Sequence, residues 1–428
     1  MESSASRYDG WSRDQLLERI AQLEGQTATS ATASPTTNTT TTTTTDKKQK
    51  KSMKKERPFD ISKYSQRHIA LKVAYLGWNY MGFAAQGDEV KVPTVEGRLF
   101  QALQNCRLIV DPENCNFSRC GRTDKGVSGL GQVVSLKVRC NNPGTPEIPY
   151  LETINRLLPE DIRVLAWAPV SPDFNARFDC KSRTYKYFFC KGTLDIDAMR
   201  EGASYMLGDH DFRNFCKLDP SKNITNYVRT ILSLDIRPVA NTQEKIGPNV
   251  DFWEVELKGT AFLWHQVRCI MSILFLVGQR LEEPTIVKDL LNIEKIPSRP
   301  DYPMASELPL LLYECEFDGI DWVYATGPTI PSPARIYQHW RDSWSASMTK
   351  TLLYQTFMRY MLPFPVTTET NLAQYLDNDS SSSRAVVLGG GKELRSAKYK
   401  KLMDRPRCDS DQVKKEKYHA KKKQKTSL

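Results

Sequence analysis

A short glycine-rich loop at residues 120–129 carries the residue types best suited to chemistry. Its three glycines bracket one carboxylate, Asp124, which has Arg122 and Lys125 beside it. Glycine allows positive φ and a close approach of the backbone to a ligand, and two neighbouring cations favour the ionised carboxylate. The loop therefore suits a reactive carboxylate or a phosphate-binding turn, although an isolated loop of this composition is more often a plain polar turn. It lacks the G-x-x-x-x-G-K-[ST] spacing of a nucleotide-binding loop.

A single arginine, Arg268, interrupts the otherwise apolar stretch at residues 262–278. A guanidinium in an apolar helix is costly unless it is paired, and its natural partner is a carboxylate held through two hydrogen bonds. The stretch contains no acid, so we expect the partner to come from another part of the chain. The alternative is a half-exposed helix from which Arg268 points to solvent.

Basic and aromatic side chains alternate at residues 183–189. A period of two places Arg183 and Tyr185 on one face of a strand, together with Tyr187 and Phe189. Such a face suits stacking on bases and contact with phosphate. An edge strand that buries its aromatic side chains in the core is the alternative.

The remaining periodicity predicts strands and helices that position these residues. Strands are expected at residues 69–75, 134–138, 162–170, 185–189 and 253–257, and helices at residues 94–103, with Thr94 as N-cap, and 262–278. Residues 1–25 are expected to form a short amphipathic helix. Residues 26–57 are expected to form a disordered Thr-rich and Lys-rich linker. Together these elements predict the α+β class, with helices covering sheets.

Composition excludes several classes of protein. The 428 residues, of which 40% are hydrophobic, suffice for a sizeable core. The longest apolar run, near residues 269–278, is too short to span a bilayer. Because no apolar stretch follows Met1, we expect no secretory signal. The ten cysteines are irregularly spaced and form no C-x-x-C pair. This spacing predicts reduced thiols and no metal site.

The net charge of +10 is concentrated in two flanking arms. Residues 46–57 carry +5 and residues 392–428 carry +9, whereas residues 58–391 carry −2. Basic arms suggest a polyanionic partner or a nuclear import signal. A tail that only improves solubility is the alternative. The slightly acidic body can bind nucleic acid only if its charges are segregated on one face.

Taken in order along the chain, these segments resemble TruA-type tRNA pseudouridine synthases. The sequence Gly-Arg-Thr-Asp-Lys-Gly-Val at residues 121–127 resembles that family's catalytic motif. Further similarities, which together span roughly residues 65–318, lie at residues 75–83, 94–97, 155–162, 174–178, 183–185, 208–212 and 262–268. Ser128 and residues 83–86 depart from the bacterial pattern, so the chain is most similar to the eukaryotic branch that modifies positions 38 and 39 of tRNA.

The resemblance implies a fold and a set of site residues. It implies two related α/β halves at residues 58–170 and 171–318, with antiparallel-rich sheets around a central cleft. An extension at residues 319–362 and a flexible basic tail at residues 363–428 are expected to follow. Asp124 matches the family's catalytic aspartate. Tyr185 matches the tyrosine that stacks on the flipped base, and Arg268 matches the arginine that pairs with the aspartate. Contacts with phosphate or base are expected from Arg122, Lys125 and Arg183.

The implied reaction isomerises uridine to pseudouridine in the tRNA anticodon stem-loop. It uses one ionised carboxylate, and we expect no cofactor and no metal. The expected partners are tRNA and a second copy of the chain, and no membrane association is expected. The expected locations are the nucleus and the cytoplasm. Two alternatives are a non-catalytic tRNA-binding or chaperone protein on the same fold and a basic-tailed structural protein of a ribonucleoprotein.

Overall fold

The computed structural model describes residues 59–87, 91–221, 224–239, 251–324, 332–367, 370–372, 374, 385–395 and 398–426. One compact unit spans Phe59–Leu428. The helix predicted at residues 1–25 and the linker predicted at residues 26–57 lie outside the described residues. No helix in the described part of the chain is long and apolar enough to cross a membrane.

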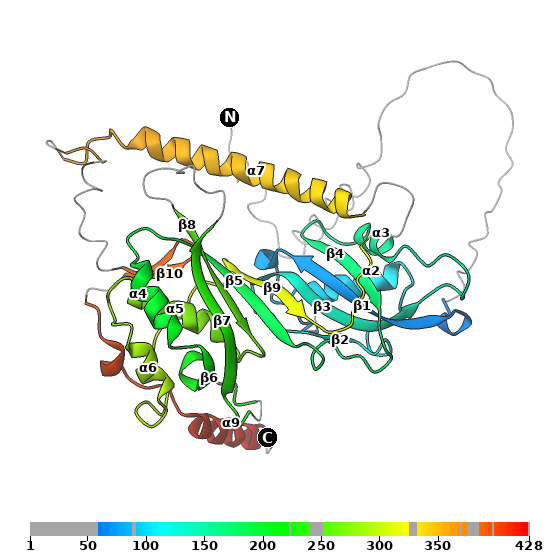
Figure 1. Ribbon diagram of the computed structural model, residues 1–428, viewed down its shortest axis with the longest axis horizontal. Helices are drawn as coiled ribbons and strands as arrows, with labels where there is room; N and C mark the ends of the chain where they lie inside the picture. The colour runs from blue at the N-terminus through cyan, green and yellow to red at the C-terminus, as the bar shows by residue number, and fades with distance from the viewer. Residues whose placement is uncertain are drawn as a thin grey trace, which may run out of the picture. The chain divides into compact units, whose positions relative to one another are not determined.

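A single nine-stranded sheet forms the centre of this unit (Figure 1). Its order is β4(Ile162–Pro169), β1(Gln66–Tyr75), β3(Ser128–Arg139), β9(Leu310–Glu316), β5(Ser182–Cys190), β8(Phe252–Gly259), β7(Val228–Pro238) and β6(Gly208–Asp211), with β2(Ser118–Arg119) paired to β3. All pairings are antiparallel except the short parallel contact of β3 with β9. The predicted antiparallel-rich α+β class is therefore confirmed. The sheets of the two halves are joined edge to edge through β9. The cleft that the family resemblance implies between the halves stays a prediction.

The first half of the sheet is covered by two helices, α2(Val95–Asn105) and α3(Tyr150–Asn155). Thr94 caps α2 as predicted, because its hydroxyl accepts a hydrogen bond of 3.1 Å from the Gly97 N–H. Leu99 and Leu103 of α2 are fully buried with Leu71 of β1 in one core cluster. The amphipathic helix and the alternating strand therefore bury their apolar faces against each other.

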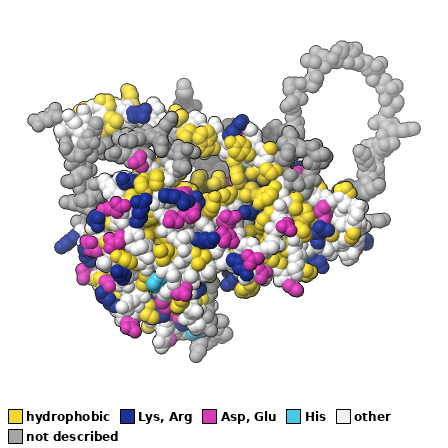
Figure 2. Space-filling model, in the orientation of Figure 1, with side chains coloured by type: hydrophobic (Ala, Val, Ile, Leu, Met, Phe, Trp, Pro, Cys, Tyr) yellow, Lys and Arg dark blue, Asp and Glu magenta, His cyan; other side chains and the backbone are white. Residues whose placement is uncertain are grey.

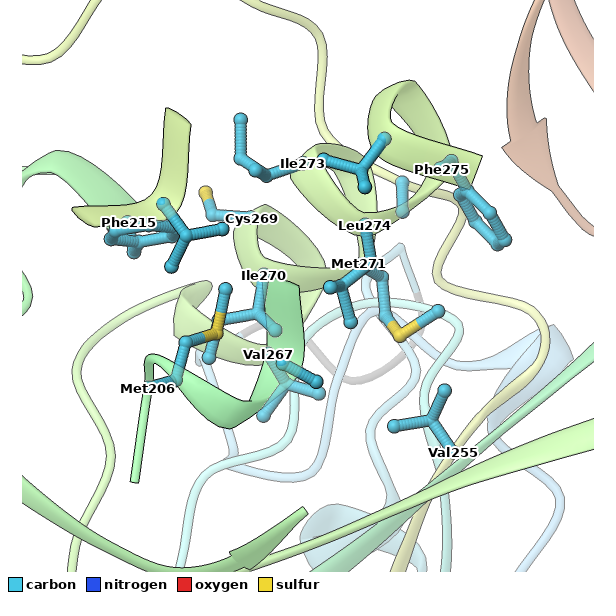
Figure 3. Close-up of a cluster of buried hydrophobic side chains, with 14 of the residues drawn as sticks. Met206, Phe215, Val255, Val267, Cys269, Ile270, Met271, Ile273, Leu274 and Phe275 are labelled. Atoms are coloured by element: carbon cyan, nitrogen blue, oxygen red, sulfur yellow. The ribbon is translucent and has the colours of Figure 1, made fainter. Parts of the chain in front are cut away.

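The second half has its own core around α5(Gln266–Gly278), and Figure 3 shows several of its buried side chains. The helices α4(Ile196–Ser204) and α6(Ile286–Leu291) contribute side chains to the same core. All residues of α5 except Arg268 are buried. The helix begins four residues later than predicted. The reason is that His265 has a φ of +62°, a left-handed conformation that cannot continue a right-handed helix.

The C-terminal region is folded in the described segments, so the prediction of a flexible tail at residues 363–428 is wrong there. It contains β10(Ala385–Gly389), β11(Lys392–Arg395) and α9(Asp411–Thr426), and the expected extension contains α7(Ser332–Met361). The carbonyl of Leu388 accepts hydrogen bonds from the Ser306 N–H (2.6 Å) and the Tyr187 hydroxyl (3.2 Å). Leu402 is fully buried. A few apolar residues inside a polar, basic segment thus anchor it to the core.

Short 3-10 helices complete the described elements. They are η2(Ile61–Lys63), η3(Gly77–Asn79), η4(Arg213–Phe215) and η6(Leu402–Asp404). Of these, η3 matters most for the site, because it follows directly on β1 and lies against the loop that carries Asp124.

Candidate active site

The loop that carries Asp124 is held by the segment that follows β1. The N–H of Phe83 donates to the Thr123 carbonyl (3.1 Å), and the N–H of Gly126 donates to the Tyr80 carbonyl (3.2 Å). The hydroxyls of Tyr75 and Thr123 are 2.8 Å apart. Backbone hydrogen bonds on both sides of Asp124 therefore fix its place, and two of the segments that carry the family resemblance lie side by side.

Two glycines allow this close packing. A Cβ on Gly77 would lie 1.9 Å from the Val127 carbonyl oxygen. A Cβ on Gly126 would lie 2.7 Å from Cγ of Glu307, and Gly126 also has a φ of +79°. Both positions therefore require glycine, the first for close approach and the second also for its left-handed conformation.

The Asp124 carboxylate faces two aromatic residues at the start of α5. The indole Nε1 of Trp264 donates to Asp124 Oδ1 at 3.2 Å. The His265 Nε2 lies 3.4 Å from Asp124 Oδ2 and forms an ion pair whenever the imidazole is protonated. The two rings are stacked, with centroids 4.3 Å apart. The carboxylate retains 24% of its exposure, so it is held from one side and open to a substrate on another.

Sequence reasoning did not predict Trp264 and His265 as neighbours of Asp124, although both belong to a segment that carries the family resemblance. The available signal was the absence of a conventional N-cap before α5: His265 takes that position without a side-chain cap. A left-handed, non-glycine residue is a sign of local strain, and such strain is found most often at functional sites.

Arg268 does not pair with Asp124, and the predicted ion pair between them is wrong. Its guanidinium instead donates to the Ala305 carbonyl (2.8 Å) and to the Glu307 carboxylate (2.9 Å). Glu307 also meets the ammonium group of Lys392 on β11 at 3.1 Å. The sequence predicted a carboxylate from another segment for this partly buried arginine, and Glu307, in the turn before β9, is that carboxylate.

The ionised state of Glu307 is favoured by these partners. Burial acts to raise its pKa. The opposing effects of a backbone hydrogen bond, the Lys392 hydrogen bond and the Arg268 charge are larger together, so the pKa lies below its usual value. Because a Cβ on Gly126 would press on Glu307, the carboxylate also forms the wall behind the Asp124 loop. Glu307 thus contacts Arg268 on one side and lies against Gly126 of the loop on the other.

Tyr185 lies in the centre of the sheet, on β5 between β9 and β8. The register aligns Gly129, Leu312 and Tyr185 on three adjacent strands, so all three face the same side. The Tyr185 ring meets that of Phe262 edge to face at 5.1 Å. Burial raises the pKa of its hydroxyl, so Tyr185 is a neutral aromatic surface. Through Leu312 it is aligned with Gly129, at the start of the strand that follows the Asp124 loop.

Three further predicted contacts differ in their surroundings. Arg122 and Lys125 are exposed on the Asp124 loop. Arg183 donates to the carbonyls of Thr260 (2.7 Å) and Arg177 (2.9 Å). It therefore ties separate segments of backbone together. Contact of any of these three cations with RNA stays a prediction.

Charges on the body are not separated on the face shown in Figure 2, where basic and acidic side chains are interspersed. Within the sheet, Lys186 meets Glu254 at 3.1 Å and Glu256 at 3.2 Å, and Lys258 meets Glu316 at 2.6 Å. Such pairs reduce the positive potential available to a phosphate backbone. The face in view is therefore not a uniformly basic surface.

The chain is similar to several known proteins. A sequence model described as tRNA pseudouridine synthase matches residues 203–318. The tRNA pseudouridine(38/39) synthase of Saccharomyces cerevisiae is 41% identical, with 97% of this chain and 93% of that protein covered. The Homo sapiens tRNA pseudouridine(38/39) synthase is 40% identical, with 83% and 77% covered. The tRNA pseudouridine synthase A of Methanothermobacter thermautotrophicus is 37% identical, with 54% and 74% covered.

These similarities and the site agree on the class of protein. The site offers one partly exposed carboxylate in a glycine-bounded loop and an aromatic residue on a neighbouring strand, which suits an isomerase that acts on a nucleotide base. The chain belongs to the tRNA pseudouridine synthase family, and the resemblance inferred from its motifs is confirmed.

Proposed function

We propose that this chain isomerises uridine to pseudouridine at positions 38 and 39 of the tRNA anticodon stem-loop. The observation that carries the proposal is the Asp124 carboxylate, fixed by backbone bonds on both sides and met by the Trp264 indole at 3.2 Å. The choice of positions is supported by the names of the yeast and human relatives. A non-catalytic tRNA-binding protein would have no use for a carboxylate held in this way.

The reaction needs little beyond that carboxylate. The bond between ribose C1′ and uracil N1 breaks, the uracil turns, and C1′ forms a bond to C5. A proton leaves C5 and N1 gains one, so no net oxidation or group transfer takes place. The Asp124 carboxylate acts at the ribose either as a nucleophile or as a base. A hydrogen bond from Trp264 to Oδ1 stabilises the charged form that both roles require.

The target base must leave the helical stack before Asp124 can reach its ribose. Extruding a base costs a few kcal/mol, and stacking on an aromatic side chain returns about 1–3 kcal/mol. Tyr185 is the residue proposed to provide this surface. It is neutral, and it is aligned through Leu312 with Gly129 at the start of the strand that follows the Asp124 loop. Arg268 supports the loop through Glu307.

Mapping pseudouridines in a defined tRNA tests the proposed positions. The full chain is incubated with an unmodified tRNA transcript that has uridine at positions 38 and 39, and with matched transcripts in which either uridine is cytidine. We expect pseudouridine at both positions in the first transcript and at the remaining uridine in each of the others. Modification confined to other positions would refute the proposed target while leaving the isomerase activity intact.

We also propose that the enzyme is a homodimer in which one tRNA contacts both subunits. Support comes from α7, which exposes large apolar side chains such as Trp344 (62%) and Phe357 (60%). Light scattering is expected to give twice the 48.9 kDa chain mass. A Trp344→Asp/Phe357→Asp double variant is expected to scatter as a monomer. A wild-type monomer at all concentrations and in the presence of tRNA would contradict the dimer.

The basic C-terminal segment is proposed to serve nuclear import as well as tRNA attraction, with the enzyme in nucleus and cytoplasm. Four lysines at residues 421–425 carry this part of the charge. Replacing all four by glutamine is expected to reduce the salt dependence of tRNA binding by roughly 0.9 for each phosphate that the segment no longer neutralises. It is also expected to shift a fluorescent fusion out of the nucleus. Unchanged binding with abolished import would leave targeting as the only role.

A further inference from the structure

Three buried cysteines from distant parts of the chain converge where the two halves of the sheet join. They are Cys120, Cys180 and Cys315, with exposures of 3%, 8% and 5%. Their sulfur atoms all lie within 4.8 Å of one another. Cys120 opens the catalytic loop, Cys180 lies just before β5, and Cys315 is on β9. From the irregular cysteine spacing no metal site was expected, and that expectation stays a prediction, although the fold brings these three thiols together.

Sequence spacing could not reveal this cluster. The three residues are 60 and 135 positions apart, whereas a zinc motif is identified by paired ligands with only about two to four residues between them. Their convergence depends on the sheet. Strand β9, which carries Cys315, pairs with β3 on one side and with β5 on the other, and the Cys120 N–H bonds to the Val133 carbonyl of β3 at 2.8 Å.

A fixed cation accompanies the three sulfur atoms. Arg183 is the register partner of Cys315 across β5 and β9. Its guanidinium also donates to the carbonyls of Cys120 (3.3 Å) and Cys180 (3.4 Å). Buried charge is tolerated when it is balanced. Three thiolates, one guanidinium and one Zn²⁺ sum to zero, and with Cu⁺ the same site would carry one net negative charge.

We propose that Cys120, Cys180 and Cys315 bind a thiophilic metal ion, either Zn²⁺ or Cu⁺, as a structural centre behind the catalytic loop. Zinc–sulfur bonds of about 2.3 Å place tetrahedral thiolates about 3.8 Å apart, so small rotations of the side chains would complete the site. Thiolate is the ligand that selects these two ions. Zn²⁺ needs a fourth ligand, whereas Cu⁺ accepts three.

The centre would add a second tie between three segments that already meet through the sheet and through the Arg183 guanidinium. On binding, each of the three thiols loses its proton to solvent and each sulfur forms one bond to the metal, without oxidation. Cys120 is four residues from Asp124, and Cys180 leads into the strand of Tyr185. The metal would therefore fix the distance between the carboxylate loop and the proposed stacking surface. It would take no part in the chemical step.

Metal binding by the full-length protein tests the proposal. Reduced, chelator-treated protein is titrated separately with Zn²⁺, Cu⁺ and, as a spectroscopic probe, Co²⁺, and the bound metal is counted. We expect one ion per chain and thiolate-to-cobalt charge-transfer absorption. Competition between Zn²⁺ and Cu⁺ at equal free concentration then shows which of the two ions the protein binds more tightly. Wild-type protein that binds none of the three metals would overturn the proposal.

Matched variants assign the ligands. Cys180→Ser and Cys315→Ser are expected to weaken binding by at least about tenfold and to remove the charge-transfer band. Cys190→Ser, at an exposed cysteine outside the cluster, is expected to change neither. Equal metal affinity in all four proteins would refute the assignment, as would a thiol count showing two of the three sulfurs joined in a disulfide in chelator-treated protein purified without reductant. The cobalt spectrum of the wild type decides the matter if a serine variant fails to fold.

Discussion

The two sides of the active site are built in different ways. On the first half, Asp124 is held by backbone hydrogen bonds and by glycines that allow two segments to touch. On the second half, α5 and the turn before β9 are held by side chains, through a chain of charges from Arg268 to Glu307 to Lys392. The first arrangement rests on main-chain contacts between two segments. The second depends on a residue from the C-terminal hairpin, so the two sides should respond differently to substitution.

On the first side, substitution of Gly77, which packs against the Asp124 loop, should have the largest effect. Gly77→Ala would place a Cβ at 1.9 Å from the Val127 carbonyl, and backbone rather than a flexible side chain would have to move. We expect a loss of about 3 kcal/mol in unfolding free energy and nearly complete loss of isomerisation. Denaturant titration and tritium release from tRNA labelled at uridine C5 measure the two effects.

Gly121→Ala is the matched control for Gly77→Ala, because a Cβ at Gly121 meets nothing within 4 Å. It is expected to leave the unfolding free energy unchanged. If Gly77→Ala and Gly121→Ala were equally stable, the close contact between η3 and the catalytic loop would not be a requirement of the fold.

Removal of the guanidinium should be the next largest effect, on the second side. Arg268→Ala leaves Glu307, which is 24% exposed, with Lys392 as its remaining ion-pair partner. We therefore expect a cost of about 2 kcal/mol, somewhat less than the loss from breaking a fully buried pair. We expect most activity to be lost. Arg268→Lys should restore it only in part, because an ammonium group cannot reproduce the guanidinium geometry that bonds both Ala305 and Glu307. A lysine variant with wild-type rate and stability would contradict this pairing.

The indole hydrogen bond joins the two sides and should have an intermediate effect. Trp264→Phe keeps an aromatic ring beside His265 but removes the donor to Asp124. A hydrogen bond to a charged group is worth about 1.5–3 kcal/mol, so kcat is expected to fall at least about tenfold. Affinity for tRNA should stay the same, as measured by filter binding. An unchanged kcat would show that the indole does not support the carboxylate during the reaction.

The outermost charge of the network should matter least. The Lys392 side chain is 49% exposed, and exposed ion pairs contribute at most about 1 kcal/mol. Lys392→Met is therefore expected to lower the unfolding free energy slightly and to leave most activity. Glu307→Gln, which weakens both pairs, provides the comparison and should cost more. A larger loss from Lys392→Met than from Glu307→Gln would place the critical contact in the hairpin.

Local sequence pattern predicted the elements well where packing and pattern agree. The strand at residues 69–75 and the Thr94 cap are examples, because alternation and capping are decided by residues close in sequence. The start of α5 was predicted too early, because apolar character at residues 262–265 says nothing about the left-handed φ of His265. The folded C-terminal region was missed because only a few apolar residues anchor it.

The candidate site shows the same limit. Asp124 could be predicted as the catalytic carboxylate because its whole motif is contiguous, and that motif was also the strongest sign of family membership. The predicted partner of Arg268 was wrong, because a partly buried arginine needs an acidic partner but its sequence position does not specify which acid. The three-cysteine cluster was invisible, since only the sheet register brings residues 60 and 135 positions apart together.

The most direct test of the account is single-turnover tritium release by Asp124→Asn. The substitution preserves the size of the side chain and the backbone bonds of the loop, but removes the ionised carboxylate. We expect the rate to fall by at least about a thousandfold, while tRNA affinity stays within a fewfold because phosphate contacts dominate binding. If Asp124→Asn releases tritium at a rate close to that of the wild type, Asp124 is not the catalytic carboxylate.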